Sequence, residues 1–169
     1  MDVMEAIKKR YSVRSYQDRA VETEKLDSIL EAARLAPSAS NRQEWRFIVV
    51  RDKDIRQRLM QAAKDQAFVG QAPVVIAACA KTDSHVMTCG QQSYPIDVAI
   101  AIEHMALKAT EEGLGTCWIG AFKEEEISRV INAPEGMCPV ALIPVGYPNE
   151  APAARSRRPI SEIMHKETF

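Results

Sequence analysis

The sequence predicts one α+β domain, built as a three-layer α/β arrangement in which helices flank a single sheet. Three observations lead to this class. The chain has 169 residues, of which 46% are hydrophobic and 27% charged, and this size suits one core that buries roughly two thirds of the unfolded surface. Strand-like apolar runs alternate with helical patterns. Residues 74–80 form a near-continuous apolar run without alternation, which is typical of a strand buried on both faces.

The N-terminal part of the chain is expected to form two helices. Asp2 can cap the first, whose apolar side chains share one face and whose exit carries Arg10. The second is predicted to have Thr23 as its N-cap and to stop at Ala36, because Pro37 disfavours helical geometry in the residue before it.

A strand, a helix and a second strand are expected next. Residues 45–50 are rich in aromatic and β-branched side chains, which favours a strand, and Asp52 can cap the helix after it. Pro73 then introduces the central strand. Residues 81–94 are polar and irregular, and a loop of this length inside a compact domain is more often functional than idle.

The strongest helix signal runs from Pro95 to about Glu112, and Gly113 can end the helix as a left-handed cap. Its apolar residues cover almost the full circumference, so the helix needs cover on all sides. A chain of this size has hardly enough other elements to provide that cover, and we therefore expect a second subunit to supply part of it. Four residues near its start are candidates, from position alone, for a substrate mouth: His85, Met87, Tyr94 and Asp97.

The last third is expected to contain a strand at residues 116–122, a helix at 124–132 and a strand at 138–147. Residues 148–169 are rich in proline and arginine and show no core-forming period, which predicts an extended C-terminal arm. We expect residues 1–169 to form a single domain that includes this arm.

Charge and cysteine content narrow the function classes. The formal net charge is −1 and the pI is about 6.3, which argues against a general nucleic-acid surface. The four cysteines include no CxxC pair, and free, mostly buried thiols suit a reducing cytoplasm. Neither a signal-peptide core nor an apolar run of about 18 residues occurs, so we expect a cytoplasmic protein without membrane association. The histidines lack metal-ligand spacing, and no metal site is expected.

The sequence does not indicate a dinucleotide-binding fold or a Walker A phosphate-binding loop. The glycines of the segment GLGTCWIG precede a predicted strand instead of following one, which contradicts the dinucleotide fingerprint. No Walker A sequence occurs either. Any nicotinamide is therefore expected to visit the protein as a transient co-substrate.

Two basic segments could hold one phosphate. Arg10, Ser12 and Arg14 alternate in an extended stretch, so their side chains project to the same side. Arg155 and Arg157 lie far away in the arm and carry forked donors that suit a phosphate. The alternative for each segment is a solvated run of charge.

Two further segments could contact a flat, polar-edged ring. The loop PSASNRQEW carries Ser38, Asn41 and Gln43, although such side chains also simply close turns. Gly120 follows a predicted strand and allows close approach of the main chain to a planar ligand, although it is also an ordinary turn residue. Trp118 could pack on the ring, but we expect it to fill core.

The order and spacing of these segments resemble the nitroreductase family of FMN-dependent oxidoreductases, in particular a short subgroup, over essentially the whole chain. Residues 10–14 match the family's R-x-S-x-R pattern. The loop is similar to P-S-x-x-N-x-Q-P-W, with Glu44 where proline is usual. The resemblance implies a nitroreductase-like sheet flanked by helices, and an obligate homodimer with a C-terminal arm and FMN at the subunit interface.

The resemblance also implies roles for these segments. It puts Arg10, Ser12 and the arm's basic pair at the FMN phosphate and ribityl chain, and Arg14 at the pyrimidine edge. The loop would reach the ring bound mainly by the other subunit, and backbone amides would face N5 and O4. The implied FMN contacts are Arg10, Tyr11, Ser12, Arg14, Pro37, Ser38, Ala39, Asn41, Gln43, Ile119, Gly120, Ala121, Arg155 and Arg157. No side chain is expected to act as a catalytic acid or base.

The implied activity is transfer of hydride from NAD(P)H through flavin N5 to electron-poor small molecules such as nitroaromatics or quinones, by a ping-pong mechanism. Two alternatives stay open: a flavin-binding or flavin-sequestering module without significant turnover, and a flavin-free structural dimer. Steady oxidation of NADH or NADPH with such an acceptor would exclude the first, and uptake of FMN would exclude the second. The residues name neither the physiological acceptor nor the preferred nicotinamide.

Overall fold

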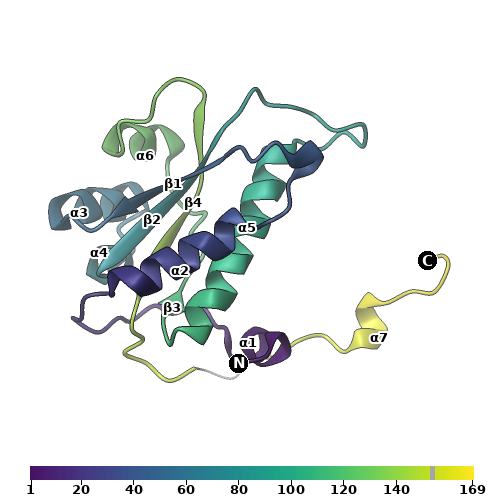
Figure 1. The fold of residues 1–169 in the computed structure, drawn as a ribbon, viewed down its shortest axis with the longest axis horizontal. Helices are drawn as coiled ribbons and strands as arrows, with labels where there is room; N and C mark the ends of the chain where they lie inside the picture. The colour runs from purple at the N-terminus through teal and green to yellow at the C-terminus, as the bar shows by residue number, and fades with distance from the viewer. Residues whose placement is uncertain (153–154) are drawn as a thin grey trace.

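One four-stranded sheet forms the middle layer of the domain (Figure 1). The computed structural model describes residues 1–152 and 155–169, and residues 153–154 of the predicted arm lie outside the described residues. In order across the sheet, the strands are β1 (Trp45–Val50), β2 (Val74–Lys81), β4 (Met137–Gly146) and β3 (Gly115–Thr116), and each adjacent pair is antiparallel. Because β2 pairs on both sides and residues 74–80 are buried, the predicted central strand is confirmed.

Helices cover both faces of this sheet. The helices of the described residues are α1 (Val3–Lys9), α2 (Thr23–Arg34), the short 3₁₀ helix η1 (Ala39–Asn41), α3 (Lys53–Ala62), α4 (Ala67–Gln71), α5 (Ser93–Glu111), α6 (Glu124–Val130) and α7 (Ile160–Ile163), of which α7 lies apart from the sheet. α2 and α5 share one apolar cluster with the sheet, and α3, α4 and α6 share another. Ile76 and Ala78 of β2 belong to the first cluster and Val75 and Ala77 to the second, as the two-residue period of a strand requires. The three-layer prediction is confirmed.

Local chemistry explains where the helices begin. The Asp2 carboxylate accepts the Glu5 N–H at 2.8 Å and the Glu5 carboxylate accepts the Asp2 N–H at 3.2 Å, which forms a capping box at α1. Asp52 caps α3 as predicted. The N-cap of α2 is Glu22, whose carboxylate accepts the Tyr147 hydroxyl at 2.6 Å. α2 ends two residues earlier than predicted.

The predicted strand at residues 116–122 is mostly wrong. Only Gly115 and Thr116 pair continuously with β4, and Ile119 returns to that strand through an isolated bridge in which it exchanges two 3.0 Å hydrogen bonds with Leu142. Trp118 lies between these two points and is 44% exposed, so the expectation that it fills core is also wrong. The propensity of the segment was strand-like, but the chain bends away from the sheet edge after Thr116.

One apolar surface of the domain stays uncovered by the described residues. α5 buries Val98 and Met105 against α2 and the sheet, yet Ile96 is exposed. Met4 and Ile7 of α1, which packs on the C-terminal part of α5, are exposed as well. The inference that a second subunit covers this side therefore stays a prediction. Within the described ranges, no helix combines the length and the apolar character needed to cross a bilayer.

Residues 148–150 still bond to the N-terminal segment, since Pro148 bridges Tyr16 and the Asn149 N–H donates to the Ser15 carbonyl at 2.9 Å. Farther along, the described part of the arm contains a separate short helix, α7 (Figure 1). α7 and the segment after it expose Ile160, Ile163 and Met164. Exposed apolar side chains gathered on one short segment are typical of an arm that docks elsewhere.

Candidate functional site

The two distant basic segments of the chain meet at one cleft of about 520 Å³. Its lining comes from the exit of α1 and from the arm, and consists of Ile7, Lys8, Lys9, Arg10, Tyr11, Ser12, Pro152, Arg155 and Arg157. Five of these side chains are cationic, so the cleft is built for an anion. Lys8 and Lys9 were not among the predicted contacts, although their place in the last turn of α1 could have suggested them.

Pairing with the edge of the sheet positions the first segment. Arg10 is the C-cap of α1 and has an extended backbone, so the helix stops there. Ser12 forms a parallel bridge with Thr116 of β3, and the Val13 N–H donates to the Thr116 carbonyl at 2.9 Å. Val13 is fully buried beneath the bridge, and Ser12 consequently faces the other way. The Arg10 Nε lies 3.8 Å from Oε1 of Glu103 on α5.

Arg14 lies next to this cleft but does not line it. Its N–H donates to Oε1 of Glu150 at 2.7 Å, and its guanidinium donates to the Ser12 carbonyl at 3.4 Å. The Tyr11 hydroxyl donates to the Glu150 carbonyl at 2.9 Å. Glu150 thus ties the start of the arm to the first segment, a link that the sequence alone did not suggest.

The thiol of Cys117 lies within the electrostatic reach of both chain ends. Burial raises the pKa of Cys117, while the charges of Arg14, Arg155 and Arg10 and a hydrogen bond with Ser12 oppose that rise. The contributions that oppose the rise thus come from residues of both basic segments.

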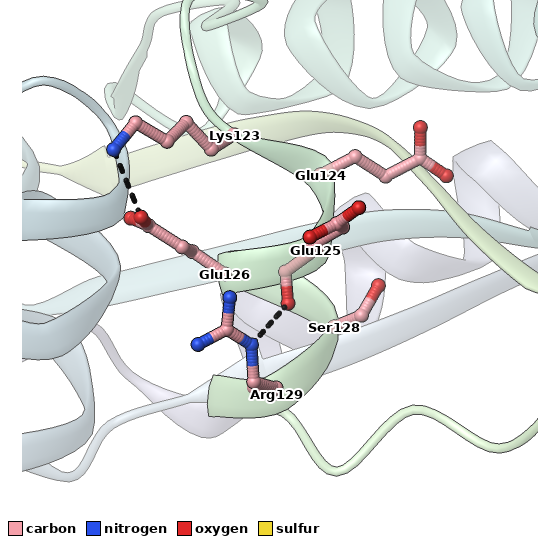
Figure 2. Close-up of a pocket in the computed structure, with 6 residues that line it drawn as sticks. All are labelled: Lys123, Glu124, Glu125, Glu126, Ser128 and Arg129. Carbon is pink, nitrogen blue, oxygen red and sulfur yellow. Dashed lines mark hydrogen bonds and ion pairs between the residues drawn. The ribbon is translucent and has the colours of Figure 1, made fainter.

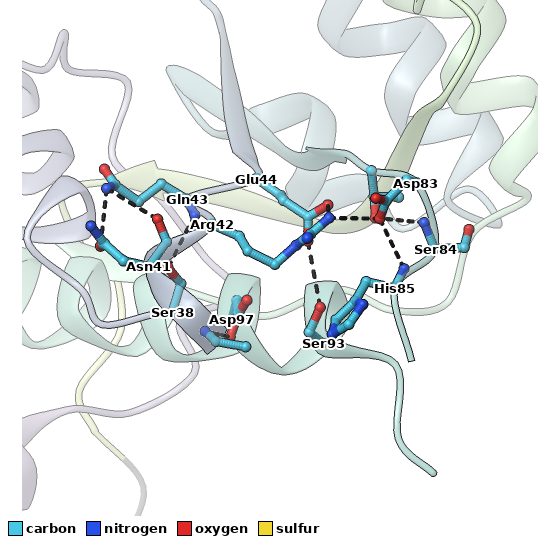
Figure 3. Close-up of polar contacts among 12 residues, drawn as sticks. Ser38, Asn41, Arg42, Gln43, Glu44, Asp83, Ser84, His85, Ser93 and Asp97 are labelled. Atoms are coloured by element: carbon cyan, nitrogen blue, oxygen red, sulfur yellow. Dashed lines mark hydrogen bonds and ion pairs between the residues drawn. The ribbon is translucent and has the colours of Figure 1, made fainter. Parts of the chain in front are cut away.

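The loop around η1 is closed by its own hydrogen bonds (Figure 3). The Gln43 N–H donates to the Ser38 hydroxyl at 3.0 Å, and the Gln43 Nε2 donates to the Asn41 Oδ1 at 3.0 Å. Asp97, predicted for a substrate mouth, is only 3% exposed and accepts the Ala39 N–H at 3.0 Å. Its Oδ2 atom is buried and has no hydrogen-bond partner among the described residues. Within one chain, none of the loop residues lines the cleft. Ser38, Asn41 and Gln43 instead close the turn, which was the alternative that the sequence left open.

The third predicted segment exposes its backbone. The Ile119 N–H is used in the bridge to β4, whereas Gly120 and Ala121 are exposed. A methyl group added at Gly120 would meet only Nε1 of Trp118, at 3.7 Å. The packing of this chain therefore does not require glycine here, which leaves room for contact with a partner molecule.

A wider hollow of about 860 Å³ lies beside α6 (Figure 2). It is lined by Lys123, Glu124, Glu125, Glu126, Ser128 and Arg129. Lys123 is paired with Glu126 at 2.9 Å, and the Arg129 Nε donates to the Glu125 carbonyl at 3.2 Å. Three glutamates make this hollow unsuitable for a phosphate. Among the described residues, no three metal-ligating side chains gather at one point.

The family model of the nitroreductase family matches residues 7–88 and 61–147. The chain belongs to the nitroreductase family. Nitroreductase family proteins of known structure from Clostridium difficile 630 (37% identity, TM-score 0.90, all of both chains covered) and Clostridium novyi NT (36%, TM-score 0.84, 89% of this chain and 87% of that one) are similar to it. It is also 31% identical over 185 residues to a Bacillus subtilis protein named FMN reductase [NAD(P)H], with 99% of this chain and 74% of that protein covered.

The family model stops at residue 147, whereas the relatives above align over nearly the whole chain, arm included. In the structure, Arg155 and Arg157 line the same cleft as Arg10 and Ser12.

Proposed function

We propose that this chain is an FMN-dependent NAD(P)H oxidoreductase whose flavin phosphate binds in the cleft between α1 and the arm. Family membership supports the oxidoreductase class: nitroreductases include the relatives named FMN reductase and NADH dehydrogenase. One observation carries the proposal beyond the class, namely that Arg10, Ser12, Arg155 and Arg157 line one cleft although they come from opposite ends of the chain.

The residues of the cleft fit a phosphomonoester. Arginine side chains present forked donors that bind two phosphate oxygens at once, and charged hydrogen bonds of this kind are about twice as strong as neutral ones. Ser12 adds a hydroxyl donor. Among the described residues, the carboxylate paired with a cleft arginine is that of Glu103, which is 3.8 Å from Arg10 and more than half exposed, so it competes weakly for that guanidinium.

The protein's own groups would hold and orient the cofactor. Arg14, with its guanidinium next to the first segment, would lie at the pyrimidine edge of the ring, and the open backbone at Gly120 would lie beside it. FMN supplies hydride transfer between NAD(P)H and an electron-poor acceptor such as a nitroaromatic or a quinone. No acid or base side chain is assigned, and one open ring face used by both substrates in turn predicts ping-pong kinetics.

We infer that the working form is a homodimer. The exposed apolar side of α1 and α5 supports this, since an exposed patch of this kind marks an interaction surface. The loop residues Asn41 and Gln43 do not line the cleft of their own chain. A second copy would bring its loop to the ring whose phosphate the first copy binds.

Comparing FMN with riboflavin, which lacks the phosphate, tests the cleft assignment. Wild-type protein is expected to bind FMN at least about 100-fold more tightly than riboflavin, because two or more charged hydrogen bonds of about 1.5–3 kcal/mol each are involved. The Arg10→Ala/Arg155→Ala variant should bind both ligands alike, as measured by quenching of flavin fluorescence.

Arg158→Ala is the matched control. Arg158 lies in the same arm, does not line the cleft and is 4.0 Å from Glu162. This variant should keep the preference for FMN. An Arg10→Ala/Arg155→Ala protein that still prefers FMN by the wild-type factor would overturn the phosphate assignment.

A further inference from the structure

Arg42 stands between Asn41 and Gln43, and its guanidinium turns away from them toward two carboxylates (Figure 3). Its Nε lies 3.3 Å from Oε2 of Glu44, and its Nη2 lies 3.3 Å from Oε1 of the same residue. The Nη2 also donates to Oδ1 of Asp83 at 2.6 Å. One side chain therefore connects the loop around η1 to the segment that follows β2.

Further hydrogen bonds close this connection into a ring. Oδ1 of Asp83 accepts the His85 N–H at 3.1 Å, and the His85 carbonyl accepts the Ser93 N–H at 3.1 Å. The Ser93 hydroxyl donates to Oε2 of Glu44 at 3.5 Å, and the Glu44 carbonyl accepts the Lys81 N–H at 2.9 Å. The loop, the 81–92 segment and the start of α5 are thus held by one network.

The buried Glu44 carboxylate restricts where the Arg42 guanidinium can lie. Glu44 is 7% exposed, and it stands where the family pattern has proline. Burial alone would raise the pKa of Glu44, but hydrogen bonds from Arg42 and Thr82 outweigh burial and the pKa lies below its ordinary value. A buried carboxylate that stays charged needs its cation close by, so Arg42 has little freedom to leave.

The backbone beside Arg42 is strained. Ser40, Asn41 and Gln43 have φ values of 49°, 55° and 51°, a region that residues with a Cβ atom adopt only when their surroundings hold them there. The bonds among Ser38, Asn41 and Gln43 are exposed and compete with water. The stretch is anchored to the rest of the domain by the Ala39–Asp97 bond on one side, by Arg42 within it, and by an exposed 3.2 Å hydrogen bond from Arg46 Nη1 to the Gln43 carbonyl on the other side.

We propose that Arg42 is a positioning residue for the flavin ring. Locked between Glu44 and Asp83, it fixes Asn41 and Gln43 in the conformation that presents their amides to the ring, and it makes that conformation depend on the 81–92 segment. This inference rests on the proposed flavin site. The competing explanation is that the ion pairs only stabilise the fold.

Asp83→Asn is the decisive variant because Asp83 is exposed, keeps its shape as Asn and belongs to a different segment from the loop. The expected result is faster amide hydrogen exchange at residues 38–44 of the flavin-free protein. Riboflavin, which tests the ring end alone, should bind about three- to tenfold more weakly, while the ratio of FMN to riboflavin affinity stays at the wild-type value. Asp83→Glu, which keeps a carboxylate for Arg42, should restore both properties.

The control is Glu31→Gln, which removes an exposed carboxylate from a 2.6 Å pair with Arg34 on α2. This variant should change neither exchange at 38–44 nor riboflavin affinity. If the wild-type protein binds flavin and Asp83→Asn matches it in both measurements, the positioning role is overturned while the proposed function stands. If the wild-type protein binds no flavin, the proposed function fails, and the presentation of the amides to a ring fails with it.

Discussion

The phosphate cleft and the loop around η1 are built in opposite ways. The cleft gathers Arg10 and Arg155 from the two extremities of the chain, and Arg10 has only a loose, exposed partner in Glu103, 3.8 Å away, among the described residues. The loop is local: Ser38, Asn41 and Gln43 bond one another, and Arg42 is fully engaged by two carboxylates. The cleft therefore has cations available for an anion, whereas the polar groups of the loop already bond to groups of their own chain.

In the proposed dimer, this difference would let one protomer contribute to two sites in two different ways. A phosphate bound in the cleft would contact cations of both α1 and the arm, and would thereby hold the arm against α1. A rigid, pre-shaped loop can be presented to another molecule at little entropic cost. We therefore expect each copy to bind one phosphate and to offer its loop to the ring held by the other copy.

Mixing two inactive variants would test this division most strongly. Arg10→Ala/Arg155→Ala lacks the phosphate end and Asn41→Ala/Gln43→Ala lacks the ring end, and each should lose most NAD(P)H oxidation with a quinone. When the two are unfolded and refolded together in equal amounts, half of the dimers pair one of each and carry one intact site, so about a quarter of wild-type activity should return. No recovery, with dimers demonstrated by light scattering, would mean that both ends of a site belong to one chain.

Two glycine substitutions should separate stability from binding. A Cβ at Gly115 would lie 2.4 Å from Cγ2 of Val13 and 3.0 Å from Cγ of Pro148, so Gly115→Ala should destabilise the edge strand that seats Ser12. We expect a loss of about 2 kcal/mol, or roughly 5 °C in Tm, in thermal unfolding of the flavin-free protein.

Gly120→Ala is the matched control, since its Cβ meets open space apart from Trp118. Its stability should stay within about 0.5 kcal/mol of wild type, while its affinity for riboflavin falls if the backbone there contacts the ring. A Tm for Gly115→Ala equal to that of Gly120→Ala would show that the edge strand tolerates the extra methyl.

Acid should weaken the network that holds the loop around η1. The Arg42 hydrogen bond lowers the pKa of Asp83, and Arg42 with Thr82 holds the pKa of Glu44 down against burial. Groups with a lowered folded pKa stabilise above their unfolded value of roughly 4 and lose that contribution as pH falls through the folded value.

The difference in free energy of unfolding between wild type and Asp83→Asn should thus be small and constant from about pH 5 to 8, and should shrink below about pH 4. Urea titrations across this range measure it. A difference that instead grows toward low pH would contradict the depressed pKa values.

Sequence patterns predicted the regular elements well where burial and local chemistry agree. β1 spans the predicted residues, β2 is the predicted central strand, and Asp2 and Asp52 cap helices as expected. The segment around Trp118 was mispredicted because strand propensity reports how residues suit a pleated surface, and it says nothing about whether β4 offers a partner at that point. The ion pair between Asp83 and Arg42 was not predicted, because the sequence of a polar loop does not show which arginine its aspartate will contact, and these two residues are 41 positions apart.

The sequence by itself determined which groups this protein can use: the alternation of Arg10, Ser12 and Arg14, the second basic pair in the arm, and the amide-bearing loop, whose order marks the family. Only the tertiary structure decided which of them meet. Residues far apart in a chain come together through packing and sheet pairing, so Ser12 on the sheet edge, Arg155 at the same cleft and Arg42 between two carboxylates become visible only once the layers are assembled.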